Sequence, residues 1–466
     1  MGNSKKLLNR NIESYLHSWI GRTDRLPIII RGARQVGKST SIQKFAHSIS
    51  RTLFEINLER HVYLDAVFAT MDTGKIFQEL ELIVKQGPLR SHHDILFLDE
   101  LQATPHAIAA LRYLYEDRPD LPIIAAGSLL EFTLSQHSFS MPVGRVEYCY
   151  MGPMLFDEYL AAAGQQQLIS YLNTFNRVED ASVSAHNQLC SHLRDYLLIG
   201  GMPRPVSRFL STRDMREVNR QHRIILDTYS DDFGKYGSKN QIPKLRSVFS
   251  HVPTAVGNKF KYSKVNTHWK SSDIHEAVTL LSQARVIAQV FHTDAGGAPL
   301  GATINEKVFK PLFLDVGLMN ASLGVQGIPI AEFESKRFIN EGSMAEQCIG
   351  QHLLYGNDFF VQPHIFYWLR EGKKNNAEVD YVIQVGTTIV PCEVKCGTSG
   401  SLRSLHQFIA GHNANFALRF DLNPPSAQDC RHTVITPGGA KEIHFRLLSL
   451  PLYMAHLANR LCEKYL

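Results

Sequence analysis

Short apolar runs alternate with segments of helical period over the first third of the chain. Ile28–Ile30 form one such run, and apolar side chains recur at helical spacing from Ile42 to Ile49 after it. Two more runs have the length of buried strands, namely Ile95–Leu98 and the stretch LPIIAA that precedes Gly127. Because strands that alternate with helices build layered sheets, the pattern predicts an open α/β domain.

The middle of the chain has a helical pattern. The stretches MLFDEYLAAAGQQQLISYLNTF and LRDYLLIGGMPRPVSRFL are amphipathic, and Gly200 and Gly201 interrupt the second. A later helix is predicted from the apolar face that runs from Ile274 to Leu281, and the alternating stretch ARVIAQVF predicts a strand after it. With the basic turn before them, these elements outline a winged helix.

The last third of the chain predicts a mixed set of elements. SMAEQCIGQHLL has a helical pattern, and HIFYWLR, AEVDYVIQVG and TTIVPCEVK have the pattern of strands, the last two joined at Gly386. SLRSLHQFIAGH returns to helical spacing, and FALRFDL predicts one more strand. The predicted order is therefore helix, three strands, helix, strand.

A phosphate-binding loop lies between the first predicted strand and its helix. The stretch GARQVGKST fits G-x-x-x-x-G-K-[ST], and the flanking strand and helix are the context that this loop requires. Backbone amides at the helix start would cradle phosphates, Lys38 would reach the β and γ oxygens, and Ser39 would hold Mg²⁺. ATP with Mg²⁺ is the expected cofactor. The expected contacts are Gly32, Ala33, Arg34, Gln35, Val36, Gly37, Lys38, Ser39 and Thr40.

Acidic and polar residues follow two of the other predicted strands. Asp99 and Glu100 come directly after Ile95–Leu98, at the carboxyl end where ligands collect in open α/β sheets. Asp99 would position Mg²⁺, and Glu100 would orient the attacking water. Ser128 ends the next strand and would sense the γ-phosphate, while Arg145 would either complete a neighbouring subunit's site or pair with a carboxylate. These alternatives for Arg145 stay open.

The combination of motifs resembles a family of prokaryotic AAA-type ATPases with a long C-terminal domain of uncharacterised function. The resemblance is carried by GARQVGKST, FLDELQ, AAGSLLEF, PVGRVEYCYMGPMLFDEYL and GGMPRPV, and it extends over nearly the whole chain. It implies an N-terminal helix (1–20), a P-loop AAA-like ATPase core (21–150), a helical lid (151–235), a winged-helix-like segment (236–300) and a restriction-endonuclease-like α/β domain (301–466). It also implies that Pro203 of the lid contacts adenine, and that the chain forms a homo-oligomer, with a hexamer as one candidate.

The C-terminal order of elements resembles the core of the PD-(D/E)XK nucleases. Asp380 lies on one predicted strand, while Glu393 and Lys395 lie two apart on the next and so share a face. With the carbonyl of Val394, the two acids would bind one or two Mg²⁺ or Mn²⁺ ions, which activate water. Lys395 would polarise the water or phosphate. Glu346 from the preceding helix would complete the metal shell, with Gln407 as a supporting residue. The alternative is an inert fold whose charges form internal ion pairs.

Length, cysteine usage and charge indicate the number of domains, the location of the protein and the kind of partner it binds. A chain of 466 residues predicts two to four domains, and its longest apolar runs are far shorter than the roughly 20 residues that cross a membrane. The seven cysteines contain no CxxC pair, which predicts free thiols and a cytoplasmic location. The segment 204–270 holds 14 Lys or Arg and 5 Asp or Glu. Such an excess suits nucleic-acid phosphates, although a solvated helical face or a protein-docking module would also carry it.

Two classes of function follow from these features. The first is an ATP-driven nucleic-acid machine, with DNA as the expected partner, whose C-terminal domain binds or cuts it. The second is a signalling or scaffolding switch whose ATP state controls assembly, with a nuclease-like fold that only binds. DNA remodelling or junction binding without cleavage lies between them.

Overall fold

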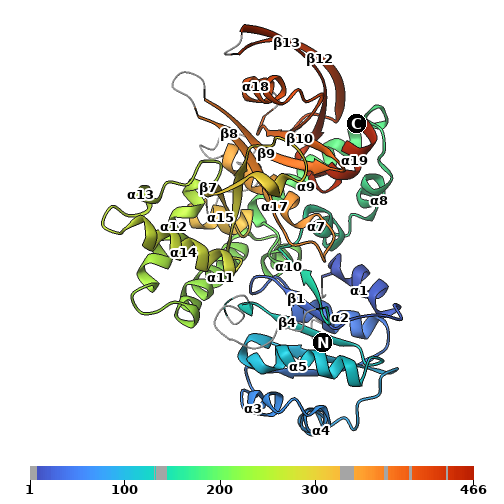
Figure 1. The fold of residues 1–466 in the computed structure, drawn as a ribbon. Helices are drawn as coiled ribbons and strands as arrows, with labels where there is room; N and C mark the ends of the chain where they lie inside the picture. Colours follow the sequence, from blue (N-terminus) through green and yellow to red (C-terminus); the bar gives the residue numbers. More distant parts are fainter. Residues whose placement is uncertain are drawn as a thin grey trace. The chain divides into compact units, whose positions relative to one another are not determined.

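The computed structural model describes residues 8–130, 132, 144–325, 341–371, 376–397, 401–436 and 439–466. The chain divides into two compact units (Figure 1). The first unit comprises Met1–Gly152 with the short segments Gln283–Arg285 and Asn357–Pro363, and the second comprises Pro153–Ser282, Val286–Gly356 and His364–Leu466. No described helix is both long enough and apolar enough to span a membrane.

The first unit is built on a parallel five-stranded sheet in the order β2-β3-β4-β1-β5. Its strands are β1 (Ile28–Arg31), β2 (Thr52–Asn57), β3 (Asp94–Asp99), β4 (Ile123–Gly127) and β5 (Glu147–Tyr150). The predicted apolar runs are confirmed as β1, β3 and β4. Both faces of β3 and β4 are buried, which explains why their sequences are continuously apolar.

Helices cover this sheet (Figure 1). They are α1 (Ile12–Ile20), α2 (Lys38–Ser48), α3 (Leu64–Ala69), α4 (Thr73–Val84) and α5 (Pro105–Asp117). Apolar residues of α3, α4 and α5 form one core with β2, β3 and β4. This core fixes the carboxyl ends of the parallel strands side by side, which is the edge at which the nucleotide site was predicted.

The second unit begins with a helical region that continues into its sheet. Its helices are α7 (Phe156–Ala162), α8 (Gln166–Thr174), α9 (Val183–Ile199), α10 (Pro203–Thr212), α11 (Met215–Tyr236), α12 (Ile242–Ala255), α13 (Tyr262–Val265), α14 (Ser271–Gln283), α15 (Val316–Ser322), α17 (Glu341–Tyr355), α18 (Arg403–His412) and α19 (Ala458–Tyr465). The predicted interruption at Gly200 and Gly201 is confirmed, since it separates α9 from α10. A Cβ on Gly201 would lie 2.0 Å from the carbonyl oxygen of Met154, so only glycine fits there.

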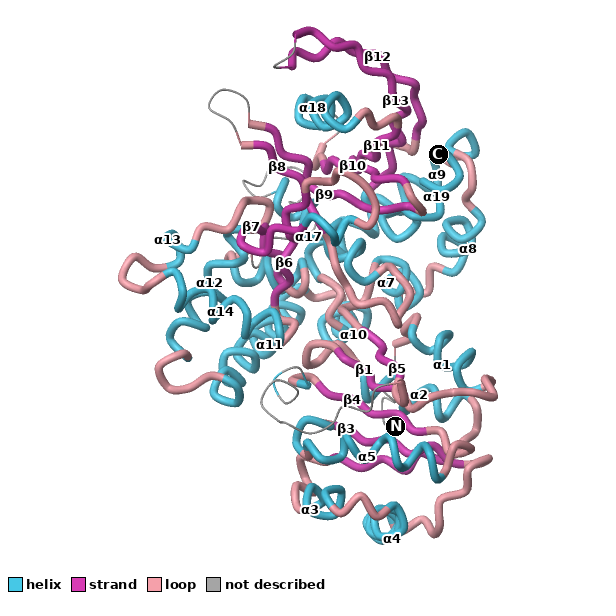
Figure 2. Tube along the Cα trace, in the orientation of Figure 1, coloured by secondary structure: helices cyan, strands magenta, loops and turns pink. Residues whose placement is uncertain are grey.

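A mixed eight-stranded sheet forms the rest of the second unit, in the order β12-β13-β11-β10-β9-β8-β6-β7 (Figure 2). Its strands are β6 (Ile287–Thr293), β7 (Ile304–Phe313), β8 (Phe366–Arg370), β9 (Ala377–Val385), β10 (Thr388–Val394), β11 (Phe416–Asp421), β12 (Ser426–Thr436) and β13 (Gly439–Pro451). The predicted order of helix, three strands, helix and strand is present as α17, β8, β9, β10, α18 and β11.

Two features of this sheet go beyond the sequence pattern. Strand β6 follows the helices α12, α13 and α14, as the winged-helix outline requires, but it also pairs with β8. One sheet therefore continues across residue 300, where the resemblance places a boundary between two segments. The long hairpin β12–β13 extends the opposite end of the sheet, and no sequence signal had indicated it.

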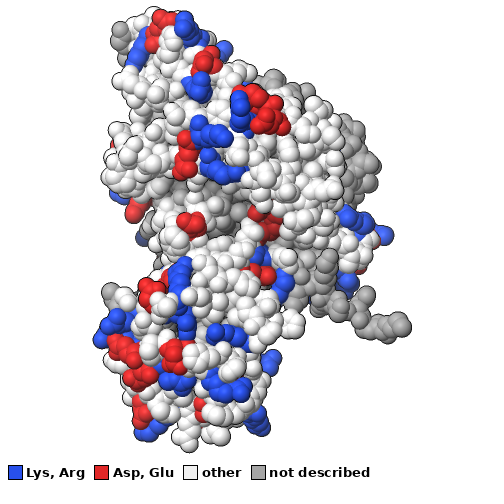
Figure 3. Space-filling model, turned by 90° about the vertical axis from the view of Figure 1, so that its right-hand side faces the viewer, with Lys and Arg blue, Asp and Glu red and all other residues white. Residues whose placement is uncertain are grey.

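Charges of both signs are interspersed on the face shown in Figure 3, where Lys and Arg stand among Asp and Glu. Such mixing gives no extended field of one sign on that face. The charged residues that matter for function are grouped in two places, at the carboxyl ends of the parallel strands and inside the second unit.

Candidate functional sites

The predicted phosphate loop joins β1 to α2 through two left-handed residues. Gln35 has φ of 61° and Gly37, which precedes the first residue of α2, has φ of 100°. The Lys38 ammonium turns back over the loop and donates to the carbonyl oxygens of Gly32 and Ala33, each at 2.9 Å. The ammonium of this buried lysine therefore lies at the loop, where a bound phosphate would meet it.

The loop is supported from outside the motif. A Cβ on Gly32 would lie 2.2 Å from the carbonyl oxygen of Met151, so the chain after β5 approaches the loop too closely for any larger residue. The buried Arg10 guanidinium donates to the carbonyl oxygens of Val36 and Gly152. Sequence analysis missed Arg10, whose only signal was an arginine shortly before the first helix.

The predicted metal-binding pair of the first unit is in contact. The hydroxyl of Ser39 donates to Asp99 Oδ2 at 2.9 Å, and the other oxygen of Asp99 accepts the Glu100 backbone N–H at 3.1 Å. Burial raises the pKa of Asp99, and the neighbouring Glu100 adds to this, against the opposing hydrogen bond from Ser39. A hydroxyl and a carboxylate that converge on the loop are ligands that Mg²⁺ prefers, so these residues fit that ion.

Glu100 follows β3 in an unusual backbone conformation. Its φ is 55° and its ψ is 48°, a left-handed geometry that is uncommon for a residue with a side chain. The Gln102 amide donates to the Glu100 carboxylate at 2.5 Å. Strain of this kind gathers at functional positions, and here it turns the chain directly after the predicted metal ligand.

Some of the remaining predicted residues of the nucleotide site are in contact with one another, and others are not. Arg34 donates to the hydroxyl of the buried Ser128 at 3.3 Å, which joins the loop to the end of β4. Arg145 donates to Glu116 at 3.0 Å, so in the single chain it pairs with a carboxylate. Ala33 and Val36 are buried, whereas Thr40 is exposed in the first turn of α2. Pro203 is the first residue of α10 in the second unit.

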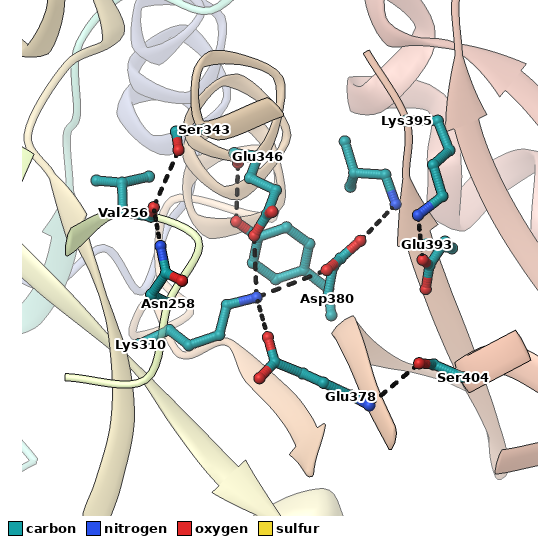
Figure 4. Close-up of polar contacts among 12 residues, drawn as sticks. Val256, Asn258, Lys310, Ser343, Glu346, Glu378, Asp380, Glu393, Lys395 and Ser404 are labelled. Carbon is teal, nitrogen blue, oxygen red and sulfur yellow. Dashed lines mark hydrogen bonds and ion pairs between the residues drawn. The ribbon is translucent and has the colours of Figure 1, made fainter. Parts of the chain in front are cut away.

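The second site is a cluster of charges around the buried Lys310 of β7 (Figure 4). The Lys310 ammonium lies 2.9 Å from Glu346 Oε2, 3.1 Å from Glu378 Oε1 and 3.6 Å from Asp380 Oδ1. Only 2% of its side chain is exposed. We call Lys310, Glu346, Glu378 and Asp380 the lysine cluster.

Burial and mutual charge control the ionisation of this cluster. Burial alone lowers the pKa of Lys310, but Glu346, Asp380 and Glu378 together outweigh it and hold that pKa well above its usual value. Burial raises the pKa of Glu346 to about 8, and Asp380 adds to this against the attraction of Lys310. Glu346 therefore tends to hold a proton near neutral pH.

The other two residues of the predicted nuclease motif form their own pair. Lys395 donates to Glu393 Oε1 at 2.5 Å, while Asp380 Oδ2 accepts the backbone N–H of Val394 at 2.8 Å (Figure 4). The buried Glu393 Oε2 has no hydrogen-bond partner among the described residues, and burial followed by the charge of Asp380 raises the pKa of Glu393 to about 7. The amide of Gln407 is engaged elsewhere, by Arg370 at 2.8 Å and by the carbonyl oxygen of Ile435 at 3.2 Å.

The expected divalent metal ion does not fit this arrangement. The carboxylates of Glu346, Glu378 and Asp380 all turn oxygens toward Lys310. The carboxylate of Glu393 is paired with Lys395. Within the described ranges no group of three or more His, Cys, Asp or Glu side chains is arranged to hold a metal ion. Lys310 and Glu378 were missed by sequence analysis, although a lysine inside the apolar stretch KVFKPLFL was a signal.

A groove of about 630 Å³ lies beside the lysine cluster. It is lined by the end of α12, the chain that leads into α13, and the ends of β8 and β9, and Glu378 belongs to both the groove and the lysine cluster. Among its lysines, Lys259 pairs with Glu371 at 2.8 Å. Lys261 and Lys264 are exposed and have no ion pair within the described chain, so they are available to an anion.

Comparison with known families agrees with the fold of the first unit. Residues 24–160 match the model described as AAA domain. Residues 190–328 match "Domain of unknown function (DUF8612)", and residues 341–428 match "Domain of unknown function (DUF4143)". None of the curated proteins matches the chain.

Several solved structures are distantly similar to this chain. The Aeropyrum pernix ORC2 protein is 10% identical with a TM-score of 0.34, and the match covers 69% of this chain and 92% of that one. The Thermotoga maritima RuvB Holliday junction branch migration motor is 15% identical with a TM-score of 0.29, covering 64% and 93%. A Pyrococcus horikoshii signal transduction ATPase (STAND) protein is 11% identical with a TM-score of 0.26, covering 74% and 48%. Similarities this low carry no argument about function. The chain combines an AAA domain with two domains of unknown function.

Proposed function

We propose that this chain hydrolyses ATP with Mg²⁺ in its first unit and binds nucleic acid, DNA in particular, through its second unit. The observation that carries the first half is the hydrogen bond of 2.9 Å between Ser39 and Asp99, which joins the phosphate loop to the end of β3. The match of residues 24–160 to an AAA domain supports the same activity.

Each predicted residue of the nucleotide site has a role in this proposal. Ser39 and Asp99 would hold Mg²⁺, which neutralises phosphate charge when bound. Lys38 would leave the carbonyls of its own loop for the β and γ phosphates. Glu100 would orient the attacking water, and Ser128 would sense the γ-phosphate. The same proposal includes a contact between Pro203 and adenine. It also includes a homo-oligomer, in which Arg145 would act in the site of a neighbouring subunit.

ATP turnover by the purified chain tests this half. We expect Mg²⁺-dependent hydrolysis that Lys38→Ala abolishes through loss of ATP binding, because its ammonium is the cation at the loop. Lys44→Ala is the matched control, since Lys44 lies on the same helix but pairs with the half-buried Glu13, away from the loop. Equal turnover in the Lys38→Ala variant and the wild type would refute the proposed site.

Nucleic-acid binding is supported by the groove beside the lysine cluster. Lys261 and Lys264 line it and form no ion pair with the residues that the structure describes, and they belong to the segment 204–270 with its excess of basic residues. Phosphate contacts of this kind release counterions, so each one lost lowers the salt dependence of binding by about 0.9 in the logarithmic slope. The helices α12 and α14 with the β6–β7 hairpin would act as the winged-helix-like support of this contact.

Binding of labelled DNA over a range of salt concentrations tests this half. The double variant Lys261→Ala, Lys264→Ala should weaken binding and flatten its salt dependence. The double variant Lys239→Ala, Lys464→Ala removes the same charge from exposed positions outside the groove, and it should bind as the wild type does. Absence of salt-dependent binding in the wild type would favour the signalling switch instead.

Metal-dependent cleavage is the second candidate for the second unit. It is favoured by the predicted order of elements and by the placement of Asp380 beside the strand that carries Glu393 and Lys395. Digestion of single-stranded, duplex and branched DNA with Mg²⁺ or Mn²⁺ tests it, with Glu393→Ala as the variant. Cleavage that Glu393→Ala abolishes would establish this candidate, whereas intact DNA with retained binding supports binding alone.

A further inference from the structure

We propose that Lys310 is the resident cation of the lysine cluster, and that the second unit binds nucleic acid without a divalent metal ion at its nuclease-like motif. The nucleic-acid part of this inference rests on the proposed function. The part that concerns the metal ion rests on the geometry of the lysine cluster alone.

The position of the ammonium is the first argument. It has a carboxylate oxygen from α17 at 2.9 Å and two more from β9 at 3.1 and 3.6 Å, and its side chain is 2% exposed. Divalent ions in proteins are bound by converging carboxylates of this kind, with oxygens as their ligands. Lys310 therefore occupies the position among these oxygens to which a cation is drawn.

The anchoring of Lys310 is the second argument. Its neighbours on β7, Phe309 and Leu312, are buried, and Phe309 stacks on Phe260 with ring centroids 5.0 Å apart. The ammonium also lies 5.6 Å from the ring centre of Tyr367 and 5.9 Å from that of Tyr381, within the range of cation–π attraction. A lysine enclosed in this way is a fixed part of the site.

The backbones of Glu346 and Glu378 are held in place near Lys310. The Glu346 backbone carbonyl accepts the hydroxyl of Tyr381 at 2.8 Å, and the Glu378 backbone N–H donates to Ser404 at 3.3 Å. A Cβ on Gly257 would lie 3.0 Å from Glu346 Oε1, so the turn after α12 closes over this carboxylate. The same turn leads into Lys259 and Lys261 of the groove, and Glu378 belongs to both the groove and the lysine cluster.

Manganese binding to the full chain tests the inference without any nucleic acid. The parent is the variant Ser39→Ala, Asp99→Asn, in which the nucleotide site can no longer hold Mn²⁺. Electron paramagnetic resonance of free Mn²⁺ counts the ions bound per chain, at concentrations that saturate the wild-type nucleotide site in the presence of ATP. We expect no ion bound to the parent, and one ion bound once Lys310→Met is added. Further addition of Asp380→Asn should abolish that ion.

Three outcomes decide the matter. The expected pattern supports Lys310 as the resident cation. A parent that binds Mn²⁺ and loses it on Asp380→Asn overturns the inference, whether or not the Lys310→Met chain folds. A folded Lys310→Met chain that binds no ion also overturns it, because the ammonium would then occupy no cation position.

The nucleic-acid arm uses the wild-type chain. Its affinity for DNA in EDTA should agree within about twofold with that in Mn²⁺, because the lysines of the groove make the phosphate contacts and no divalent ion takes part in either condition. A twofold difference in affinity is small, because a free-energy change of about 1.4 kcal/mol alters the affinity tenfold. A strict requirement for Mn²⁺ would overturn the inference, whereas no DNA binding in either condition would refute the proposed function and leave the Mn²⁺ titration to decide the role of Lys310.

Discussion

The hydroxyl of Ser39 and the carboxylate of Asp99 are joined by a hydrogen bond of 2.9 Å, although 60 residues separate them in the sequence. Parallel pairing in the order β3-β4-β1 brings the ends of their elements together. The contact gives the first unit the oxygen pair that Mg²⁺ would bridge to a nucleotide. Predictions for this unit depend on that pair and on the residue that follows it.

Glu100→Gln should separate ATP binding from hydrolysis. The substitution removes the carboxylate that would orient water but leaves Lys38, Ser39 and Asp99 in place. We expect ATP binding near the wild-type level and turnover lower by about 10²- to 10⁴-fold, the contribution of a positioned general base. Equilibrium binding of ATP and steady-state turnover measure the two effects. Normal turnover in Glu100→Gln would remove this residue from the mechanism.

Gly32→Ala should damage the phosphate loop without touching its charged groups. Its Cβ would lie 2.2 Å from the carbonyl oxygen of Met151, so the backbone has to shift. We expect a loss of about 1–3 kcal/mol in the free energy of unfolding, together with weaker ATP binding. Gly21→Ala is the control, because its nearest contact would be an ordinary 3.7 Å. Equal stability of the two variants would show that the loop can relax.

Lys310→Met should strongly destabilise the second unit. It leaves three half-buried carboxylates without their buried cation, and breaking a fully buried ion pair on one side costs about 3–5 kcal/mol, which sets the upper end of the expected loss. Lys307→Met, on the exposed part of the same strand, is the matched control. Denaturant unfolding measures these differences, and a Lys310→Met chain as stable as the control would contradict the account of the lysine cluster.

Asp315 should make stability depend on pH. It accepts backbone N–H groups from Gly201 at 2.5 Å and from Leu318 at 3.0 Å. Burial nevertheless raises its pKa from 3.8 to about 6. The folded state then binds more protons between these values, so stability falls as pH rises from about 4 to about 6. A shift of roughly two units corresponds to about 3 kcal/mol.

The variant Asp315→Asn isolates this effect, because asparagine does not titrate. The free energy of unfolding of the wild type, relative to the variant, should be highest near pH 4 and decline toward pH 7. Denaturant unfolding at several pH values measures the difference. If the difference stays constant over this range, or grows with pH, the pKa of Asp315 is not raised in the folded chain. That result would contradict the prediction.

The two sites differ in how far the sequence predicted them. The nucleotide site was predictable because Gly32–Thr40 is continuous, and because apolar runs that end in Asp99 or Ser128 place these residues at one edge of a parallel sheet. Arg10 was not predictable, since its contacts with Val36 and Gly152 depend on how the first helix packs.

In the second unit the sequence predicted the elements but not the partners of their charges. Asp380, Glu393 and Glu346 lie on the strands and the helix that were expected. The decisive residue, Lys310, comes from a strand far upstream whose pairing with β6 no local pattern fixes. The hairpin β12–β13 was missed because most of its outer strand is exposed and lacks a clear apolar alternation.

The most direct test of the central claim is the rate of ATP hydrolysis by the wild-type chain with and without DNA, at low and at high salt. The account predicts that DNA changes the rate at low salt, and that high salt removes this effect because it displaces the phosphate contacts of the groove. A chain that hydrolyses ATP at the same rate under all four conditions would contradict coupling to nucleic acid. It would leave an ATPase whose second unit serves another partner.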